Sequence, residues 1–92
     1  MITKQSSRLL ERIIKGFANH RRLEILDLLS RQSELSVEEI SDKLQIGYVN
    51  ASDHIRKMAI AGLLLKRHEG TAVRHKLTSR ALAILVFCKK LE

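Results

Sequence analysis

The sequence is poor in the residues that disulfide-bonded and metal-bound scaffolds need. Its 92 residues include one cysteine, no proline and no tryptophan, and aromatic residues make up 3%. A single cysteine excludes a disulfide framework and a four-cysteine zinc site. No apolar run reaches the roughly 18 residues of a membrane span, and residues 1–7 lack the apolar stretch of a signal peptide. We therefore expect a reduced, cytoplasmic chain with no membrane partner.

The sequence also lacks the patterns of common enzymes. It contains no glycine-rich phosphate loop, no paired carboxylates in a plausible cleft, and no activated serine or cysteine constellation. The hydrophobic fraction of 45% is enough for a core and too high for a disordered chain. We expect one domain over residues 1–92 that is not an enzyme and needs no cofactor.

Charge is abundant, and it is unevenly distributed along the chain. The formal net charge is +7. Residues 1–22 hold six basic and one acidic residue, a net charge of +5, and residues 23–53 hold two basic and seven acidic residues, a net charge of −5. Residues 54–92 hold nine basic and two acidic residues, a net charge of +7. This segregation favours one surface for a polyanion and another that faces solvent, although a solvated charged surface without a partner has the same composition.

Apolar residues recur every three or four positions in the first two thirds of the chain. This spacing predicts amphipathic helices over 5–18, 20–30, 37–44 and 48–61. Asn19 is a good N-cap residue for the second helix, whose core face we expect to hold Leu23, Leu26 and either Leu29 or Ile25. The run Ser36-Val37-Glu38-Glu39 is a capping box that starts the third helix, and Gly62 ends the fourth.

The periodicity changes after residue 62. Residues 63–68 and 72–77 read as two strands around a turn at Glu69-Gly70. This pairing places Leu64, Val73 and Leu77 on one face with Lys66, His68 and His75. The opposite face then carries Leu65, Arg67, Arg74 and Lys76. A last helix is expected over 79–91.

The last helix contains eight consecutive apolar residues, from Ala81 to Cys88. Eight helical residues go round the axis more than twice, so this helix is apolar on every side. A second subunit, joined by the N-terminal helix, is the expected cover; the alternative is a fully buried helix in a monomer. In the first case the dimer interface is expected to contain Leu9, Leu10, Ile13, Phe17, Leu82, Leu85 and Val86. Cys88 is expected to be a small buried hydrophobe, or else a redox switch that pairs across the dimer.

The order of elements predicts a winged helix-turn-helix, in a mainly α fold with a small β-hairpin. A capped helix, a three-residue turn at 45–47 and a second helix form the helix-turn-helix, and a basic hairpin follows directly. Not every such domain binds DNA. A protein- or RNA-interaction module is therefore the alternative to a DNA-binding regulator.

Several motifs resemble those of the ArsR family, the arsenical-resistance-repressor-like regulators. They are Phe17 to Leu26 at the second helix, Ser36 to Ile40 at the third, Ser52-Asp53-His54-Ile55 with Ala61-Gly62-Leu63-Leu64, and Glu69-Gly70 in the wing. The resemblance implies a homodimeric, sequence-specific regulator of transcription that binds double-stranded DNA, with repression as the expected activity. The sequence departs from the family pattern at His20-Arg21, at Gln45, where such turns favour glycine, at Tyr48-Val49-Asn50 and at Thr71.

The resembled family is best known for metal sensors, but their ligands are missing here. The family's Cys-x-Cys pattern at the third helix is replaced by Ser36-Val37-Glu38, and the last helix has no histidine. His68 and His75 share one face of the hairpin without a cysteine or carboxylate partner at sensible spacing. We therefore expect no metal site.

The helix over 48–61 is expected to enter the major groove with its N-terminal residues first, and the wing over 63–77 to contact the DNA backbone. The candidate base-contacting residues are Tyr48, Val49, Asn50, Ser52, Asp53 and Arg56; Asp53 either accepts from a cytosine amine or repels phosphate. The candidate phosphate contacts are Lys57, Lys66, Arg67, Arg74 and Lys76. The expected operator is an imperfect inverted repeat with half-sites about one helical turn apart.

Overall fold

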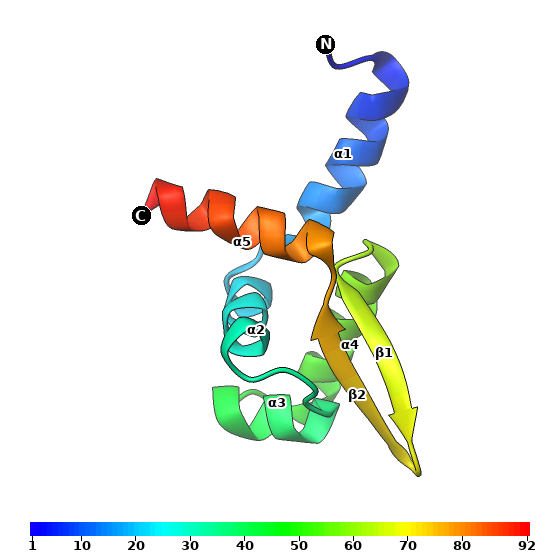
Figure 1. Cartoon of the computed structure of the whole chain (residues 1–92), viewed down its shortest axis with the longest axis vertical. Helices are drawn as coiled ribbons and strands as arrows, with labels where there is room; N and C mark the ends of the chain where they lie inside the picture. Colours follow the sequence, from blue (N-terminus) through cyan, green and yellow to red (C-terminus); the bar gives the residue numbers. More distant parts are fainter.

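The computed structural model describes residues 1–92 as five helices and one two-stranded antiparallel hairpin (Figure 1). In chain order the elements are α1 (Lys4–Phe17), α2 (His20–Arg31), α3 (Val37–Leu44), α4 (Tyr48–Ile60), β1 (Leu64–Glu69), β2 (Ala72–Leu77) and α5 (Ser79–Leu91). No end differs from its predicted position by more than one residue. The predicted mainly α fold with a winged helix-turn-helix is confirmed.

Side-chain N-caps stand at the starts of α2, α3 and α5. Asn19 accepts hydrogen bonds from the backbone N–H groups of Arg21 and Arg22. The predicted capping box is present, because the Glu39 N–H donates to Ser36 Oγ at 3.2 Å and the Ser36 N–H donates to Glu39 Oε1 at 2.9 Å. At the start of α5, Thr78 Oγ1 accepts from the Ala81 N–H at 3.2 Å. These bonds satisfy N–H groups that have no partner inside the helix.

The turn between α3 and α4 has a non-glycine residue in the left-handed region. Gln45 adopts φ 55° and ψ 46° at the C-cap of α3. An L-residue with a side chain pays roughly 1–2 kcal/mol for this conformation. The Gln45 Nε2 group donates to the Asp42 carbonyl oxygen at 2.7 Å, which satisfies one carbonyl at the end of α3. The turn therefore keeps its three residues without the glycine that such turns favour.

The core lies where α2, α3, α4, the hairpin and α5 meet. Its fully buried side chains include Ile25, Leu26, Ile40, Ile55 and Met58. The prediction that Leu23 faces the core is wrong, because Leu23 is 37% exposed. The buried stripe of α2 is formed by Ile25, Leu26, Leu28 and Leu29, and Leu23 lies at its edge, one turn before Leu26.

The hairpin has the predicted faces. Leu64 pairs with Leu77, Lys66 with His75 and His68 with Val73. His75 is 1% exposed, and its Nδ1 lies 2.9 Å from the Leu35 carbonyl oxygen. The His75 N–H donates to that same carbonyl at 2.9 Å. This contact joins the wing to the segment that precedes α3, and burial lowers the pKa of His75 below its usual value.

α1 and α5 extend beyond the rest of the molecule at the end opposite α3 and the hairpin tip (Figure 1). α1 rises away from the body and contacts α4 and α2 near its C-terminal end, and α5 runs across the top of α2. No helix is both long enough and apolar enough to cross a membrane. The outer parts of both terminal helices thus have no neighbour within the chain.

Gly16 allows the close approach of α1 to the end of α4. It is buried, and a methyl group added there would overlap the Ala61 side chain. We expect Gly16→Ala to lower the free energy of unfolding by about 1–3 kcal/mol, the usual cost of overpacking. Urea unfolding measures this loss. The control Gly47→Ser adds a side chain where no atom lies within 4 Å, and a serine N-cap should not destabilise α4. Equal stability of the two variants would contradict the close α1–α4 contact.

Candidate nucleic-acid interface

The N-terminal turn of α4 is exposed. Tyr48 is 58% exposed and Val49 is 79% exposed, and Asn50 is exposed as well. Gly47 is the N-cap and offers no side-chain acceptor to the first N–H groups of the helix. The opposite face of α4 is buried through Ala51, Ile55 and Met58, as predicted. Packing of that face therefore fixes which side chains of α4 point outward.

A cleft of about 220 Å³ lies between α4, α3 and the hairpin. Ser52 and Arg56 line it from α4, and Lys66 lines it from β1. His75 and Val37 complete its inner wall. The fold thus brings together predicted site residues from the recognition helix and from the wing. A phosphate group at this cleft would meet an arginine, a lysine and a hydroxyl.

Asp53 is an internal partner for the cations of α4. Its carboxylate accepts from Arg56 Nη2 at 2.8 Å and lies 3.1 Å from Lys57 Nζ. The hydrogen bond from Arg56, followed by that from Lys57, lowers the pKa of Asp53 below its usual value. Asp53 therefore stays charged and holds both cations along one face of α4. Its predicted contact with a cytosine amine stays a prediction.

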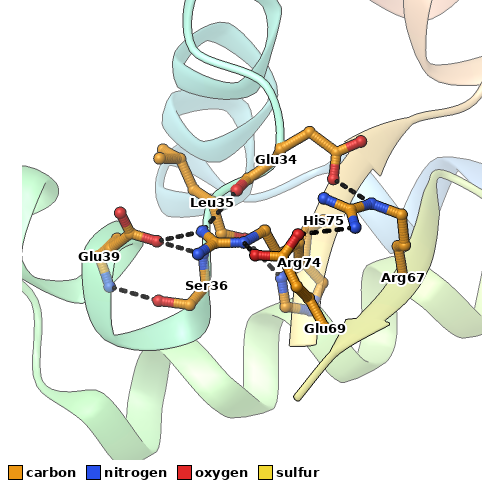
Figure 2. Close-up of polar contacts among 8 residues, drawn as sticks. All are labelled: Glu34, Leu35, Ser36, Glu39, Arg67, Glu69, Arg74 and His75. Atoms are coloured by element: carbon orange, nitrogen blue, oxygen red, sulfur yellow. Dashed lines mark hydrogen bonds and ion pairs between the residues drawn. The ribbon is translucent and has the colours of Figure 1, made fainter. Parts of the chain in front are cut away.

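Two wing arginines lie in an ion-pair cluster beside α3 (Figure 2). We call it the wing cluster; its members are Glu34, Glu39, Arg67, Glu69 and Arg74. Arg74 donates to Glu39 Oε1 and to the Glu34 carbonyl, both at 3.1 Å, and lies 3.4 Å from Glu69 Oε1. Arg67 donates to Glu34 Oε2 at 3.1 Å and to Glu69 Oε2 at 2.9 Å. Both arginines thus have anionic partners within the chain.

The four predicted phosphate contacts on the hairpin differ in whether they have a partner within the chain. Lys66 and Lys76 make no ion pair or side-chain hydrogen bond, unlike Arg67 and Arg74. Lys66 lies on the face toward α4, and Lys76 lies on the opposite face. The sequence could not show which hairpin cations form ion pairs with the segment before and at the start of α3. Glu34 is more than thirty residues from Arg67, and Glu39 is more than thirty residues from Arg74.

We expect Arg74 to hold the wing in place. Arg74→Gln should lower the free energy of unfolding by about 1–2 kcal/mol, because it leaves Glu39 and the Glu34 carbonyl without their charged donor. The matched control is Lys76→Gln, two residues along the same strand, which should change stability by less than about 0.5 kcal/mol. Urea unfolding of both variants measures the difference. Equal losses would mean that the wing cluster does not stabilise the wing.

His54 connects α4 with the start of α2. The Arg22 Nε–H donates to His54 Nδ1 at 3.1 Å, and Arg22 Nη1 donates to the Lys15 carbonyl at 2.9 Å. Burial, together with the charge of Arg22, lowers the pKa of His54. A neutral imidazole whose Nδ1 accepts carries its proton on Nε2. Arg22 and His54 are 32 residues apart in the sequence and come from different helices, so the sequence did not indicate that they are partners.

The residues predicted for the dimer interface fall into three groups. Leu9, Leu10, Leu82 and Val86 are exposed, and Ile13 and Phe17 are half-buried. Leu85 instead packs in the core of its own chain, because the inner face of α5 covers α2. Ile14 and Phe87 are exposed apolar residues that the prediction omitted.

Cys88 is the free thiol of the chain. It lies on α5 and is half-buried, so it is less enclosed than predicted. No group of three or more histidine, cysteine, aspartate or glutamate side chains is arranged to hold a metal ion.

Comparison with known proteins finds a match to one protein family in the segment that contains the helix-turn-helix. The family described as "Bacterial regulatory protein, arsR family" matches residues 19–66. The HTH-type transcriptional regulator Rv0324 of Mycobacterium tuberculosis is 36% identical over 74 residues, which are 80% of this chain and 32% of that protein. The transcriptional activator HlyU of Vibrio cholerae is 34% identical over 74 residues, 80% of this chain and 68% of that protein. The chain thus spans about a third of the first relative and two thirds of the second.

Solved structures extend the likeness to nearly the whole chain. HlyU from Vibrio cholerae superposes with a TM-score of 0.83 at 30% identity, covering 97% of both chains. The winged helix-turn-helix DNA-binding domain of Mb0332 from Mycobacterium bovis, described as homodimeric, superposes with a TM-score of 0.82 at 29% identity. That match covers 97% of this chain and 85% of the other. The likeness therefore includes α1 and α5 as well as the helix-turn-helix.

Proposed function

This chain belongs to the ArsR family of bacterial regulatory proteins, and from that membership we propose that two copies of it bind one double-stranded DNA operator. As a family member it is a winged helix-turn-helix regulator of transcription. The observation that carries the proposal is the arrangement at α4. The helix exposes its N-terminal turn, and the cleft beside it brings Ser52 and Arg56 together with Lys66 of the wing.

In this proposal α4 reads the major groove. Tyr48, Val49 and Asn50 reach the groove first, since a recognition helix enters with its N-terminal residues. Val49 contacts a thymine methyl, and Arg56 contacts guanine or a phosphate. Arg56 donates to Asp53 at 2.8 Å, so DNA competes with Asp53 for Arg56.

The phosphate contacts of the proposal give affinity and not sequence preference. Two of these contacts lie near Arg56: Lys66 lines the same cleft, and Lys57 shares the partner Asp53 with Arg56. Lys76 lies on the outer face of the wing, and Arg67 and Arg74 reach phosphate only if they exchange an internal carboxylate for it. With about four phosphate contacts in each of two protomers, log K falls with log salt at a slope of roughly −7.

The second copy is proposed to bind through the outer faces of α1 and α5. Leu9, Leu10, Leu82 and Val86 are large apolar side chains that are 37% to 54% exposed in the single chain, and the similar domain of Mb0332 is homodimeric. Pairing of two copies gives an operator with two inverted half-sites. Repression stays a prediction, since the relative HlyU is named an activator.

Titration of random-sequence duplex DNA at increasing salt tests the proposal. The expected result is nonspecific binding with a Kd of about 10⁻⁶–10⁻⁴ M at physiological salt and a slope near −7. A single-stranded RNA of the same length is the competitor. Absence of duplex binding at low salt, or tighter binding of the RNA, would favour a protein- or RNA-interaction module and contradict a DNA-binding regulator.

A further inference from the structure

A second groove, of about 410 Å³, lies between α1 and the C-terminal end of α4. Its apolar lining comes from Leu9 and Ile13 on α1 and from Ile60 and Ala61 at the end of α4. The rise of a helix places Ile60 about 18 Å along the α4 axis from Tyr48, at the opposite end of the helix. The volume lies within the range of about 300–1,000 Å³ found for small-molecule sites. The groove therefore has room for the apolar part of one small ligand, at the end of α4 opposite its exposed N-terminal turn.

All charged side chains that line this groove are basic. They are Arg12, Lys15, Arg22, Lys57 and Arg80. Two of them are neutralised by neighbours outside the groove, because Lys15 lies 3.3 Å from Glu11 and Lys57 lies 3.1 Å from Asp53. The other three are arginines without any carboxylate partner.

Two of these arginines are held in place by neutral acceptors. Arg22 donates to His54 Nδ1 and to the Lys15 carbonyl, and Arg80 Nη1 donates to the Ala61 carbonyl at 2.9 Å. These bonds orient the guanidinium groups without neutralising their charge, and each guanidinium keeps further N–H donors free. The Arg12 guanidinium makes no hydrogen bond or ion pair within the chain. The wing arginines, in contrast, all have carboxylate partners.

We propose that this groove binds a carboxylate that is carried on an apolar body, such as a medium-chain fatty acid or an acid of similar size. Arginine donors match a carboxylate with two parallel hydrogen bonds. The apolar body lies on Ile13, Ile60 and Ala61, where it covers hydrocarbon surface, whereas Leu9, which also lines the groove, is assigned to the contact between copies. Cationic ligands are excluded by the three unpaired guanidinium groups.

The groove also contacts the recognition helix. Lys57 of α4 lines it, and Arg22 joins it to His54 of the same helix. Occupancy is therefore expected to change the affinity for duplex DNA. This second effect rests on the proposed function, whereas binding of the acid does not.

Calorimetric titration of the protein with decanoate tests the site. The variant Arg12→Gln/Arg80→Gln removes two unpaired charges of the groove. Its matched control, Arg8→Gln/Arg31→Gln, removes two charges from outside the groove lining. Arg12→Gln alone is the second variant, because the Arg12 side chain makes no hydrogen bond or ion pair whose loss would destabilise the chain. Decyltrimethylammonium, with the same chain and the opposite charge, is the matched ligand.

We expect saturable decanoate binding to the parent. The double variant Arg12→Gln/Arg80→Gln should weaken it about tenfold or more, and Arg12→Gln alone about threefold or more, because each variant loses charge-assisted hydrogen bonding to the carboxylate. The control variant should stay within about twofold of the parent, and the cation should not bind. Amide shifts in NMR spectra should include Gly16 and Ala61.

Absence of decanoate binding, equal binding of the cation, or equal losses in the groove and control variants would overturn the site. Dissociation of the dimer by decanoate, seen by light scattering, would show that the groove holds a second copy and would also overturn it. Unchanged DNA affinity with bound decanoate would contradict the coupling alone.

Discussion

Replacing Leu82 and Val86 together by glutamate is expected to give a folded monomer whose affinity for duplex DNA is about 10²–10⁴-fold lower. Leu82 is 49% exposed and Val86 is 54% exposed in the single chain, and neither belongs to its core. Charges at these positions thus leave the protomer intact. In a dimer each carboxylate would enter an apolar interface without a partner, which is strongly unfavourable. Loss of the second copy removes the second set of DNA contacts.

Light scattering and DNA titration measure this result. The parent should have a mass near twice the 10.5 kDa of one chain, and the double variant a mass near one chain with an unchanged helical content. Leu65→Glu is the control for mass, because Leu65 is similarly exposed but lies on the wing. A dimeric double variant, or a monomeric parent, would contradict the assignment of the interface to α1 and α5.

Removing the cations near the cleft should have the second large effect. The variant Arg56→Gln/Lys57→Gln/Lys66→Gln deletes about six phosphate contacts from a dimer, so the salt slope should change from roughly −7 to about −2. Affinity at low salt should fall about 10³-fold or more. Both numbers follow from release of fewer counterions by the bound protein, and binding titrations at several salt concentrations measure them.

The matched control removes the same number of positive charges elsewhere. Lys4→Gln/Lys89→Gln/Lys90→Gln changes the ends of α1 and α5, which lie away from α4 and the wing. Net charge falls equally in both variants. The control should keep the parent's slope to within about one unit, because distant charges are screened beyond roughly 10 Å. A control that loses as much as the cleft variant would mean that net charge, and not the interface, governs binding.

The parts of the fold that are set by neighbouring residues were predictable from the sequence. Asn19, Ser36 and Glu39 act through bonds that span two or three positions, so the helix starts could be located to one residue. The strand faces followed from the period of two and an even loop. The exposed face of α4 followed because Ala51, Ile55 and Met58 fix the buried one.

Contacts between distant segments were not predictable in the same way. Leu23 and Leu85 are equally apolar in sequence, but only the packing of α2 against α5 and α4 decides that the first is exposed and the second buried. The wing cluster pairs Arg74 with Glu39, which is 35 residues away. Glu34, whose φ is 68° in the structure, accepts from Arg67 through its carboxylate and from Arg74 through its carbonyl, and both partners are more than thirty residues away.

Selection of bound sequences from a pool of random duplex DNA tests the central claim most directly. That claim is that two copies join through α1 and α5 and place one α4 each in the major groove. It predicts an enriched inverted repeat whose half-site centres lie about 10–10.5 base pairs apart, or a multiple of that spacing. Enrichment of a single unrepeated site, or no enrichment from a folded dimer, would contradict it.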